Sequence, residues 1–95
     1  MCYNRTIKEV KRLNKKKLLA RLQNNSNNVR YGDFILLAEA FGFKHRRTEG
    51  SHNIYKNPVV GESLNLQEEK GKAKPYQIKQ FLAIIEKYNL RMEGE

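Results

Sequence analysis

The stretch from Tyr31 to Gly42 constrains the fold of this chain more than any other part of it. Four apolar side chains recur at i, i+3, i+4 and i+7, which places them on one helical face: Phe34, Leu37, Ala38 and Phe41. Asp33 suits the positive end of the helix dipole, and Gly42 suits a left-handed residue just past the helix end. The pattern predicts a helix over residues 31–41 with one buried face.

Two other helices are expected on either side of this one. The segment Thr6–Glu9 has the form of a capping box, and the apolar stripe that follows predicts either one helix or two, because Lys15–Lys17 interrupts it. The stronger part of that stripe is Lys16–Gln23. Near the other end, Pro75 suits a helix start, and residues at helical spacing follow it: Ile78, Phe81, Leu82, Ile85 and Tyr88. Residues 91–95 are expected to form a frayed tail.

Strands are expected between the second and last helices. Phe43–Thr48 and Ser51–Lys56 predict a hairpin around a Glu49-Gly50 turn, and Ser63–Gln67 predicts a short third strand. The segment from Gln67 to Lys74 is expected to be a loop. A chain of 95 residues has room for one core, so the predicted fold is one α+β domain with a three-stranded antiparallel sheet and helices on one face, in the order α-α-β-β-β-α.

The expected turn also sets which hairpin side chains are opposite one another. It pairs Thr48 with Ser51, Arg47 with His52, and His45 with Ile54. Phe43 and Ile54 would then mark the helix-packed face, with His52 and Arg47 near its open end. A bulge at Gly50 would reverse this assignment.

The positive charge is concentrated in one part of the chain. The formal net charge is +9, and residues 1–60 hold 13 basic and 4 acidic side chains, against 6 and 6 in residues 61–95. Such a field favours a polyanionic partner, and nucleic acid is the expected one. The alternative is that the charge serves only solubility.

Several classes of protein do not fit the sequence. Cys2 is the only cysteine and Asp33 the only aspartate, so neither a disulfide nor a metal site with recognisable ligand spacing is expected. No glycine-rich phosphate loop is present, and no cofactor is expected. There is no apolar run of membrane-spanning length and no signal-peptide pattern, so a cytoplasmic protein is predicted.

Metal-free acid/base chemistry on RNA remains, because the 2′-hydroxyl of RNA is a built-in nucleophile. The imidazole of His52, which follows the turn glycine Gly50, can take either proton role near neutral pH. Charge to stabilise the reacting phosphate is expected first from Arg47. The other supporting candidates around the hairpin are Arg46, Lys44, Lys56, Tyr55 and Ser51.

Each of these residues also has a simpler interpretation. His52 is a surface or turn residue on that view, Tyr55 packs rather than stacks on a base, and Arg46 and Arg47 form a solvated face. His45 is interpreted as structural. Three lysines before the last helix are expected either to grip RNA phosphates or only to solubilise a loop: Lys70, Lys72 and Lys74.

Three segments together resemble the HicA toxin family. They are Asn28–Phe34, Ala40–Phe43 and Gly50–Tyr55, and the segments Leu64–Gln67 and Gly71–Ile78 resemble a longer branch of that family. The resemblance covers about residues 15–90. Residues 1–14 are then an N-terminal extension, 15–90 the core, and 91–95 the tail of a single HicA-like domain.

The resemblance implies an mRNA interferase, a metal-independent endoribonuclease, with a fold like a double-stranded-RNA-binding domain. The family's catalytic histidine falls on His52. A HicB-type antitoxin is the implied partner, covering that histidine, and DNA would be contacted only through the antitoxin. The alternative is a non-catalytic double-stranded-RNA-binding module. A protein using residues 31–41 as a DNA recognition helix is a weaker alternative, because that helix has few basic residues.

Overall fold

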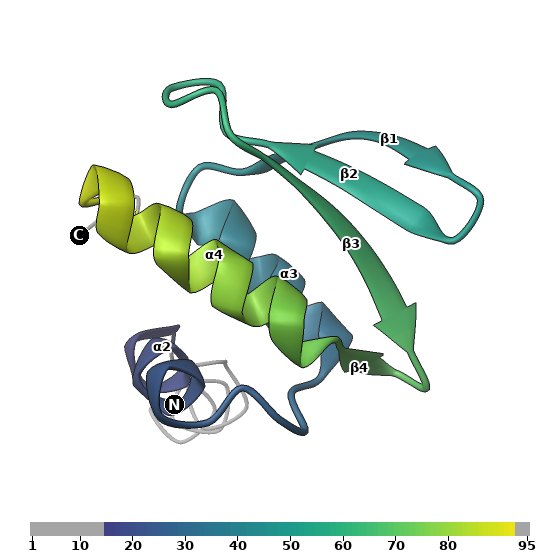
Figure 1. Ribbon diagram of the computed structural model, residues 1–95, viewed down its shortest axis with the longest axis horizontal. Helices are drawn as coiled ribbons and strands as arrows, with labels where there is room; N and C mark the ends of the chain where they lie inside the picture. Colours follow the sequence, from purple (N-terminus) through teal and green to yellow (C-terminus); the bar gives the residue numbers. More distant parts are fainter. Residues whose placement is uncertain (1–14, 93–95) are drawn as a thin grey trace, which may run out of the picture.

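The computed structural model describes residues 15–92 as two helices, four strands and a final helix. In chain order these are α2 (Lys15–Asn24), α3 (Tyr31–Ala40), β1 (Lys44–Glu49), β2 (His52–Lys56), β3 (Ser63–Glu69), β4 (Lys72–Ala73) and α4 (Pro75–Tyr88), as Figure 1 shows. The predicted α+β class is therefore confirmed. The capping box at Thr6–Glu9 and the stripe before Lys15 lie outside the described residues.

The core forms around Phe81 of α4. Its ring makes edge-to-face contacts with Phe34, Phe41 and Phe43 at centroid distances of 5.3, 5.7 and 5.9 Å, an arrangement that aromatic quadrupoles favour. The four side chains of the predicted α3 stripe are all buried, as expected: Phe34, Leu37, Ala38 and Phe41.

Helix α3 ends at Ala40, one residue before the predicted end at Phe41, and the expected stop at Gly42 is confirmed. Gly42 has a φ of 96°, its N–H bonds to the carbonyl of Glu39, and the Phe43 N–H bonds to the carbonyl of Ala38. This pair of bonds is a Schellman motif, which needs a left-handed residue at the glycine position. The motif turns the chain so that Phe43 enters the core and β1 begins.

Two details of the helical prediction need correction. In α4 the buried side chains are Gln77, Ile78, Phe81 and Ile84, while the expected core residues Leu82, Ile85 and Tyr88 are only partly buried. The expected frayed tail is wrong at Met92, which is 8% exposed and belongs to the core. Helix α4 turns a slightly different face inward than expected because it packs against α3 and β3 together.

The sheet has four antiparallel strands in the order β1-β2-β3-β4, not three. The expected loop from Gln67 to Lys74 is wrong: β3 runs on to Glu69, and Lys70 and Gly71 make a tight turn with φ values of 53° and 79°. Positive φ at both central residues matches a type I′ hairpin turn. The prediction missed β4 because a strand of two residues has no readable alternation.

A distant segment of the chain holds β4 in place. Arg30 pairs with Lys72 in an isolated bridge, and the Ala73 N–H donates to the carbonyl of Val29 at 2.8 Å. The residues just before α3 therefore lie beside β4, opposite β3. This joins the start of α3 to the start of α4.

The β1–β2 turn is one residue later than predicted. Gly50 and Ser51 form it, so Glu49 pairs with His52, Thr48 with Asn53 and Arg47 with Ile54. Gly50 has a φ of 62°, and a glycine at the first central position is typical of a type II′ turn. The expected pairings of Arg47 with His52, Thr48 with Ser51 and His45 with Ile54 are therefore wrong.

A β-bulge in β1 also changes which of its side chains share a face of the sheet. The register shifts between His45, which pairs with Tyr55, and Arg47, so Arg46 is the extra residue. Tyr55 is buried whereas Ile54 is only partly buried, so Tyr55 and not Ile54 packs toward the helices. His52, Ile54 and Arg47 share the opposite face.

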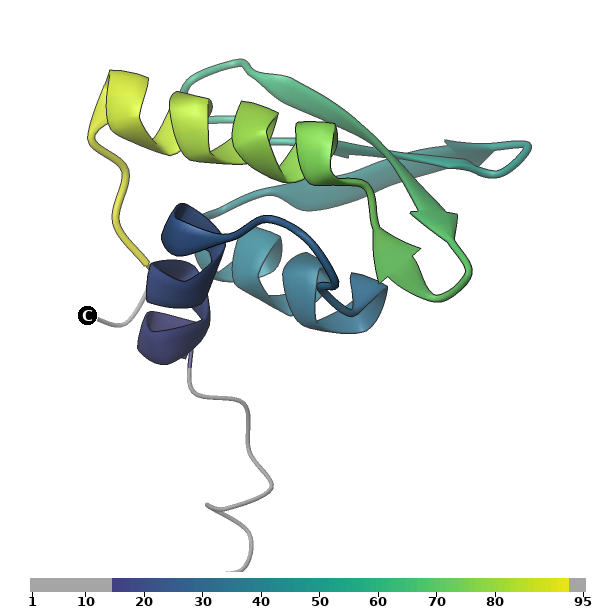
Figure 2. The same cartoon turned by 60° about the horizontal axis from the view of Figure 1, so that its bottom comes forward.

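Helices cover only one face of the sheet. Along β3, Leu64 and Leu66 are buried whereas Ser63 and Asn65 are exposed, as alternation requires when one face is free. Figures 1 and 2 show the β1–β2 hairpin extending beyond the ends of α3 and α4, with α2 on the far side of both helices. Among the described residues, no helix is long and apolar enough to cross a membrane.

Candidate active site

His52 is the first residue of β2 and lies on the face of the sheet that carries no helix. Its side chain is half-buried, and its Nδ1 lies 2.9 Å from Oδ1 of Asn65 on β3. The backbone register places Glu49 beside it on β1 and Gln67 beside it on β3. The imidazole therefore stands in a polar cross-strand row that is open to solvent on one side.

Arg47 shares this face with His52 but is not directly across the ladder from it. Its Nε donates to Oε2 of Glu49 at 2.5 Å, and both side chains are more than half exposed. The hydrogen bond and positive charge of Arg47 lower the pKa of the Glu49 carboxyl, with a smaller contribution from His52. The residue directly opposite His52 is therefore an ionised glutamate, which sequence reasoning missed because it assumed the earlier turn.

The remaining basic residues of β1 and β2 lie farther from the histidine. Lys44 and Lys56 pair with each other at the opposite end of the hairpin. Lys56 is four positions after His52 in β2, which is about 13 Å along the strand. Arg46 is exposed at the bulge. Lys44 and Lys56 thus lie at the end of the hairpin away from His52 and are not in its immediate surroundings.

A second polar row leads from the turn to the start of α4. Gln67 donates from Nε2 to the Ser51 hydroxyl at 2.9 Å, and its Oε1 accepts from Nζ of Lys74 at 2.8 Å. Because Gln67 is directly across from His52, this row brings Lys74 to the histidine end of the sheet. Of the three lysines before α4, Lys74 is the one that the hydrogen bonds connect to the site.

The other two lysines point elsewhere. Nζ of Lys72 donates to Oδ1 of Asn28, at the loop before α3, and Lys70 is exposed in the β3–β4 turn. The three lysines therefore do not share a hydrogen-bond partner: Lys72 bonds Asn28 and Lys74 bonds Gln67.

Tyr55 and His45 lie on the face of the sheet opposite His52. Tyr55 is 8% exposed, its ring is edge-to-face with His45 at 5.2 Å, and burial raises the pKa of its phenol. The phenol therefore packs into the core and does not offer a stacking platform beside His52. The structural interpretation of His45 agrees with this contact.

His45 also begins a hydrogen-bonded chain that anchors the hairpin to α3. Thr48 donates its hydroxyl to Oδ1 of Asn53 at 2.8 Å, so its oxygen accepts from Nε2–H of His45 at 3.0 Å. Asn53 in turn donates to the hydroxyl of Tyr31 at 2.8 Å. The chain supports the hairpin where it begins to extend past the helices, and no local sequence signal predicts it.

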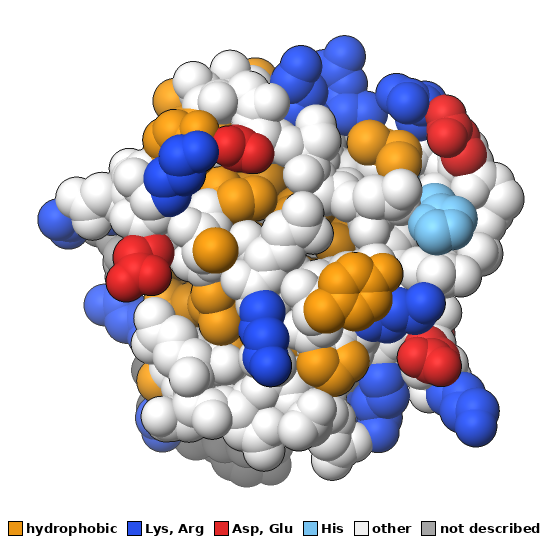
Figure 3. Space-filling view, viewed as in Figure 1, with side chains coloured by type: hydrophobic (Ala, Val, Ile, Leu, Met, Phe, Trp, Pro, Cys, Tyr) orange, Lys and Arg blue, Asp and Glu red, His pale blue; other side chains and the backbone are white. Residues whose placement is uncertain are grey.

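The surface around the hairpin is mainly basic, with acidic groups among the basic ones. In the space-filling view, Lys and Arg side chains gather along the border where Figure 1 draws β1 and β2 (Figure 3).

Within residues 15–92 there is no group of three or more His, Cys, Asp or Glu side chains that could hold a metal ion.

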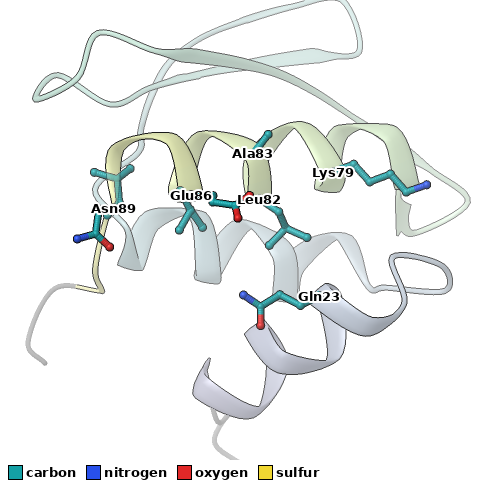
Figure 4. A pocket seen from close by; sticks show the side chains of 8 residues that line it. Gln23, Lys79, Leu82, Ala83, Glu86 and Asn89 are labelled. Carbon is teal, nitrogen blue, oxygen red and sulfur yellow. The ribbon is translucent and has the colours of Figure 1, made fainter.

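A groove of about 610 Å³ lies on the other side of the molecule, between α2 and the outer face of α4. Its lining includes Gln23, Lys79, Leu82, Glu86 and Asn89 (Figure 4). None of these residues belongs to the sheet, so the groove is separate from the histidine row.

No family model, curated protein or solved structure matches this chain. The fold and the site therefore define a class in chemical terms only. The chain is an α+β domain whose uncovered sheet face carries one half-buried histidine among cationic and amide side chains.

Proposed function

We propose that this chain is a metal-independent endoribonuclease of the HicA toxin type, with His52 as its acid/base catalyst. The observation that carries the proposal is the placement of His52: half-buried, on the uncovered face of a basic hairpin, and hydrogen-bonded through Nδ1 to Asn65. A histidine held by a second side chain and open to solvent is suited to proton transfer with a bound substrate.

The reaction class follows from the groups on this face. His52 would take the proton of a 2′-hydroxyl, and the resulting oxygen would attack the adjacent phosphorus. Because general acid/base help is worth about 10²–10⁴-fold, cationic groups must stabilise the phosphorane as well. Arg47 and Lys74 are the two candidates nearest the histidine row.

Arg47 is available despite its bond to Glu49. Both partners are more than half exposed, and exposed ion pairs typically contribute little. A phosphate can therefore replace the carboxylate on the guanidinium, which binds such oxygens in a bidentate manner. Lys44 and Lys56 would bind the strand farther along the same face.

The biological setting is part of the same proposal. The domain would have a fold like a double-stranded-RNA-binding domain, act in the cytoplasm on mRNA, and be inhibited by a HicB-type antitoxin that covers His52. Contact with DNA would then occur only through the antitoxin. The resemblance of Gly50–Tyr55 and the segments around it to HicA toxins supports this assignment.

A second candidate is a non-catalytic double-stranded-RNA-binding module. The observation that favours it is the run of lysines that precedes α4: Lys70 in the β3–β4 turn, Lys72 in β4 and Lys74 at the N-cap of α4. Lys72 and Lys74 already donate to Asn28 and Gln67. Both lysines would have to exchange these partners for phosphate.

The test compares His52→Ala with His45→Ala, the matched change at the other histidine, which lies on the opposite face. We expect the wild type and His45→Ala to cut RNA in EDTA, and His52→Ala to lose cleavage by at least about 100-fold. Circular dichroism checks that all three proteins are folded.

Equal cleavage by His52→Ala and the wild type would remove His52 from the mechanism. RNA binding without cleavage by the wild type would favour the binding module instead. Cleavage abolished by EDTA would contradict a metal-independent reaction.

A further inference from the structure

The hydrogen bond between His52 and Asn65 determines which ring nitrogen carries a proton. Oδ1 of Asn65 is an amide oxygen, which has lone pairs and no hydrogen, so it can only accept. At 2.9 Å from this oxygen, Nδ1 of His52 must be the donor. In the neutral ring the lone pair is then on Nε2.

The other ring nitrogen is left for a substrate. Within residues 15–92, no hydrogen-bonding group of the protein contacts Nε2 of His52. The ring is half-buried on the helix-free face of the sheet. Nε2, the ring nitrogen with the lone pair, is therefore the one that makes no bond to Asn65.

Asn65 is itself held by a buried glutamine of α4. Gln77 is 2% exposed; its Nε2 donates to the Asn65 carbonyl at 2.8 Å, and its Oε1 accepts from the Gln67 N–H at 3.1 Å. Strand β4 pairs only with Glu68 and Glu69, so no strand runs beside residues 65–67 on that side. The glutamine amide supplies the donor and acceptor that a neighbouring strand would have supplied.

The backbone around Asn65 is thus hydrogen-bonded on both edges of β3. Strand β2 pairs with β3 on one side, where Asn65 is opposite Ile54 and Gln67 opposite His52. Gln77 binds the same stretch of β3 on the other side. A side chain on a backbone fixed in this way can orient a neighbouring ring without ordering itself at the moment of reaction.

We propose that Asn65 is the positioning residue of the site, an inference that rests on the proposed ribonuclease function. By accepting from Nδ1–H, Asn65 keeps Nε2 free to receive a proton. Nε2 then accepts the 2′-hydroxyl proton while the 2′-oxygen bonds to phosphorus. The bond from phosphorus to the 5′-oxygen breaks, and that oxygen takes a proton from water.

The proton that His52 has taken up is returned in the last step. The hydroxide left by that water is neutralised by the proton that Nε2 carries, so the imidazole returns to its starting form. Nδ1–H donates to Asn65 throughout. The products are a 2′,3′-cyclic phosphate and a free 5′-hydroxyl.

The first measurement is the tautomer of the neutral His52 ring, read from long-range ¹H–¹⁵N correlation spectra of the full chain. For the wild type we expect Nδ1 protonated and Nε2 unprotonated. Asn65→Ala should revert to the tautomer that histidine prefers in water, with the proton on Nε2. Ser63→Ala is the matched control, on the same strand and the same face, and should keep the wild-type spectrum.

The second measurement is cleavage by the same variants. Asn65→Ala should lose on the order of 10–100-fold in kcat, as when an outer partner that orients a histidine is removed, with little change in KM. Asn65→Asp keeps an acceptor at Nδ1 and should retain the wild-type tautomer. Its pH–rate profile should move to higher pH, because a carboxylate favours the protonated ring.

The outcomes separate this inference from the proposed function. If the wild type cleaves RNA but its neutral His52 ring carries the proton on Nε2, or if Asn65→Ala cleaves as fast as Ser63→Ala, the positioning role is overturned while the ribonuclease stands. If the wild type does not cleave RNA at all, both are overturned.

Discussion

One extra residue in β1 determines which side chains meet at the site. The bulge at Arg46 leaves His45 on the helix-packed face and moves Arg47 to the open face, where it bonds Glu49 beside His52. Without the bulge, strict alternation would have kept positions 45 and 47 on the same face. The chemistry of the open face therefore depends on an irregularity of a single residue.

Tyr55, on the buried side of the same hairpin, gives a prediction about pH. Burial is the largest cause of the raised pKa of its phenol, and the nearby Glu39 and Tyr31 add to it. The folded protein thus keeps the phenol proton at pH values where the unfolded chain loses it. The stability that this phenol contributes to the folded state is fully present below the ordinary tyrosine pKa of 10.0. It is lost as the pH rises through the raised pKa of the folded state.

We therefore expect the wild type to lose more stability than Tyr55→Phe when the pH is raised from 8.5 to 11. Denaturant unfolding of both proteins at the two pH values measures this difference. A phenylalanine has no proton to lose, so its curve reports the other titrating groups alone. Parallel losses in the two proteins would show that the Tyr55 phenol is not linked to folding.

At the scale of elements, the site depends on two tight turns and one side chain that replaces a strand. The Gly50-Ser51 turn sets the register that brings Glu49 beside His52, and the Lys70-Gly71 turn ends β3 and starts β4, which pairs only with Glu68 and Glu69. Gln77 then bonds the backbone of Asn65 and Gln67, which β4 leaves without a strand partner. None of these features is a helix or a long strand, yet each fixes the row of residues around His52.

The importance of the first turn can be measured with two glycines. An added Cβ would meet nothing within 4 Å at Gly50 or at Gly32, but only Gly50 has a positive φ, of 62°. Gly50→Ala should cost about 1–2 kcal/mol, because a left-handed conformation is unfavourable for alanine. Gly32→Ala, inside α3, should stabilise by roughly 0.5–1 kcal/mol.

Chemical denaturation of both variants tests the pair, and RNA cleavage tests its link to the site. If the turn controls the register, Gly50→Ala should also slow cleavage, whereas Gly32→Ala should leave it unchanged. Destabilisation of similar size in both variants would argue that loss of space, and not the backbone conformation at Gly50, is responsible.

At the scale of the whole molecule, the helices and the charged strands occupy different sides. The core around Phe81 needs only one face of the sheet, which leaves the other face for Lys44, Arg47, Lys56 and the His52 row. The groove between α2 and α4 lies on the other side. A bound nucleic acid strand along the open sheet face would therefore not disturb the core.

Salt dependence of RNA binding tests that arrangement. In a His52→Ala background, in which we expect no cleavage, Lys56→Gln should reduce the slope of log affinity against log salt by about 0.7, one phosphate contact for single-stranded RNA. Lys79→Gln removes the same charge from the outer face of α4 and should leave the slope unchanged. Equal effects of the two changes on the slope would mean that RNA binding depends only on the net charge and not on the sheet face.

The helical part of the fold could be predicted because its signals are local. The stripe from Phe34 to Phe41 and the glycine after it specify a buried face and an end within a dozen residues. The stripes of α2 and α4 are read in the same way, with an error only in how far α4 is rotated. The existence of the hairpin, the identity of its turn glycine and the basic character of its strands were equally visible.

The layout of the site could not be predicted in the same way. The position of Gly50 in its turn and the bulge at Arg46 both shift the pairing by one residue, and either shift reverses the faces. Strand β4 is held by residues 29–31, far away in the chain. Asn65 reaches His52 across 13 residues, and Gln77 reaches Asn65 across 12.

The sequence by itself determined the fold class, the helices, the presence of a basic hairpin and the candidate histidine, because each is encoded by neighbours at the period of a helix or strand. Only the tertiary structure decided that His52 stands opposite Glu49, donates to Asn65 and lies on the helix-free face. Those relations are set by strand register and by side chains from separate elements, and the free energies that select one register over the next come from packing the whole core.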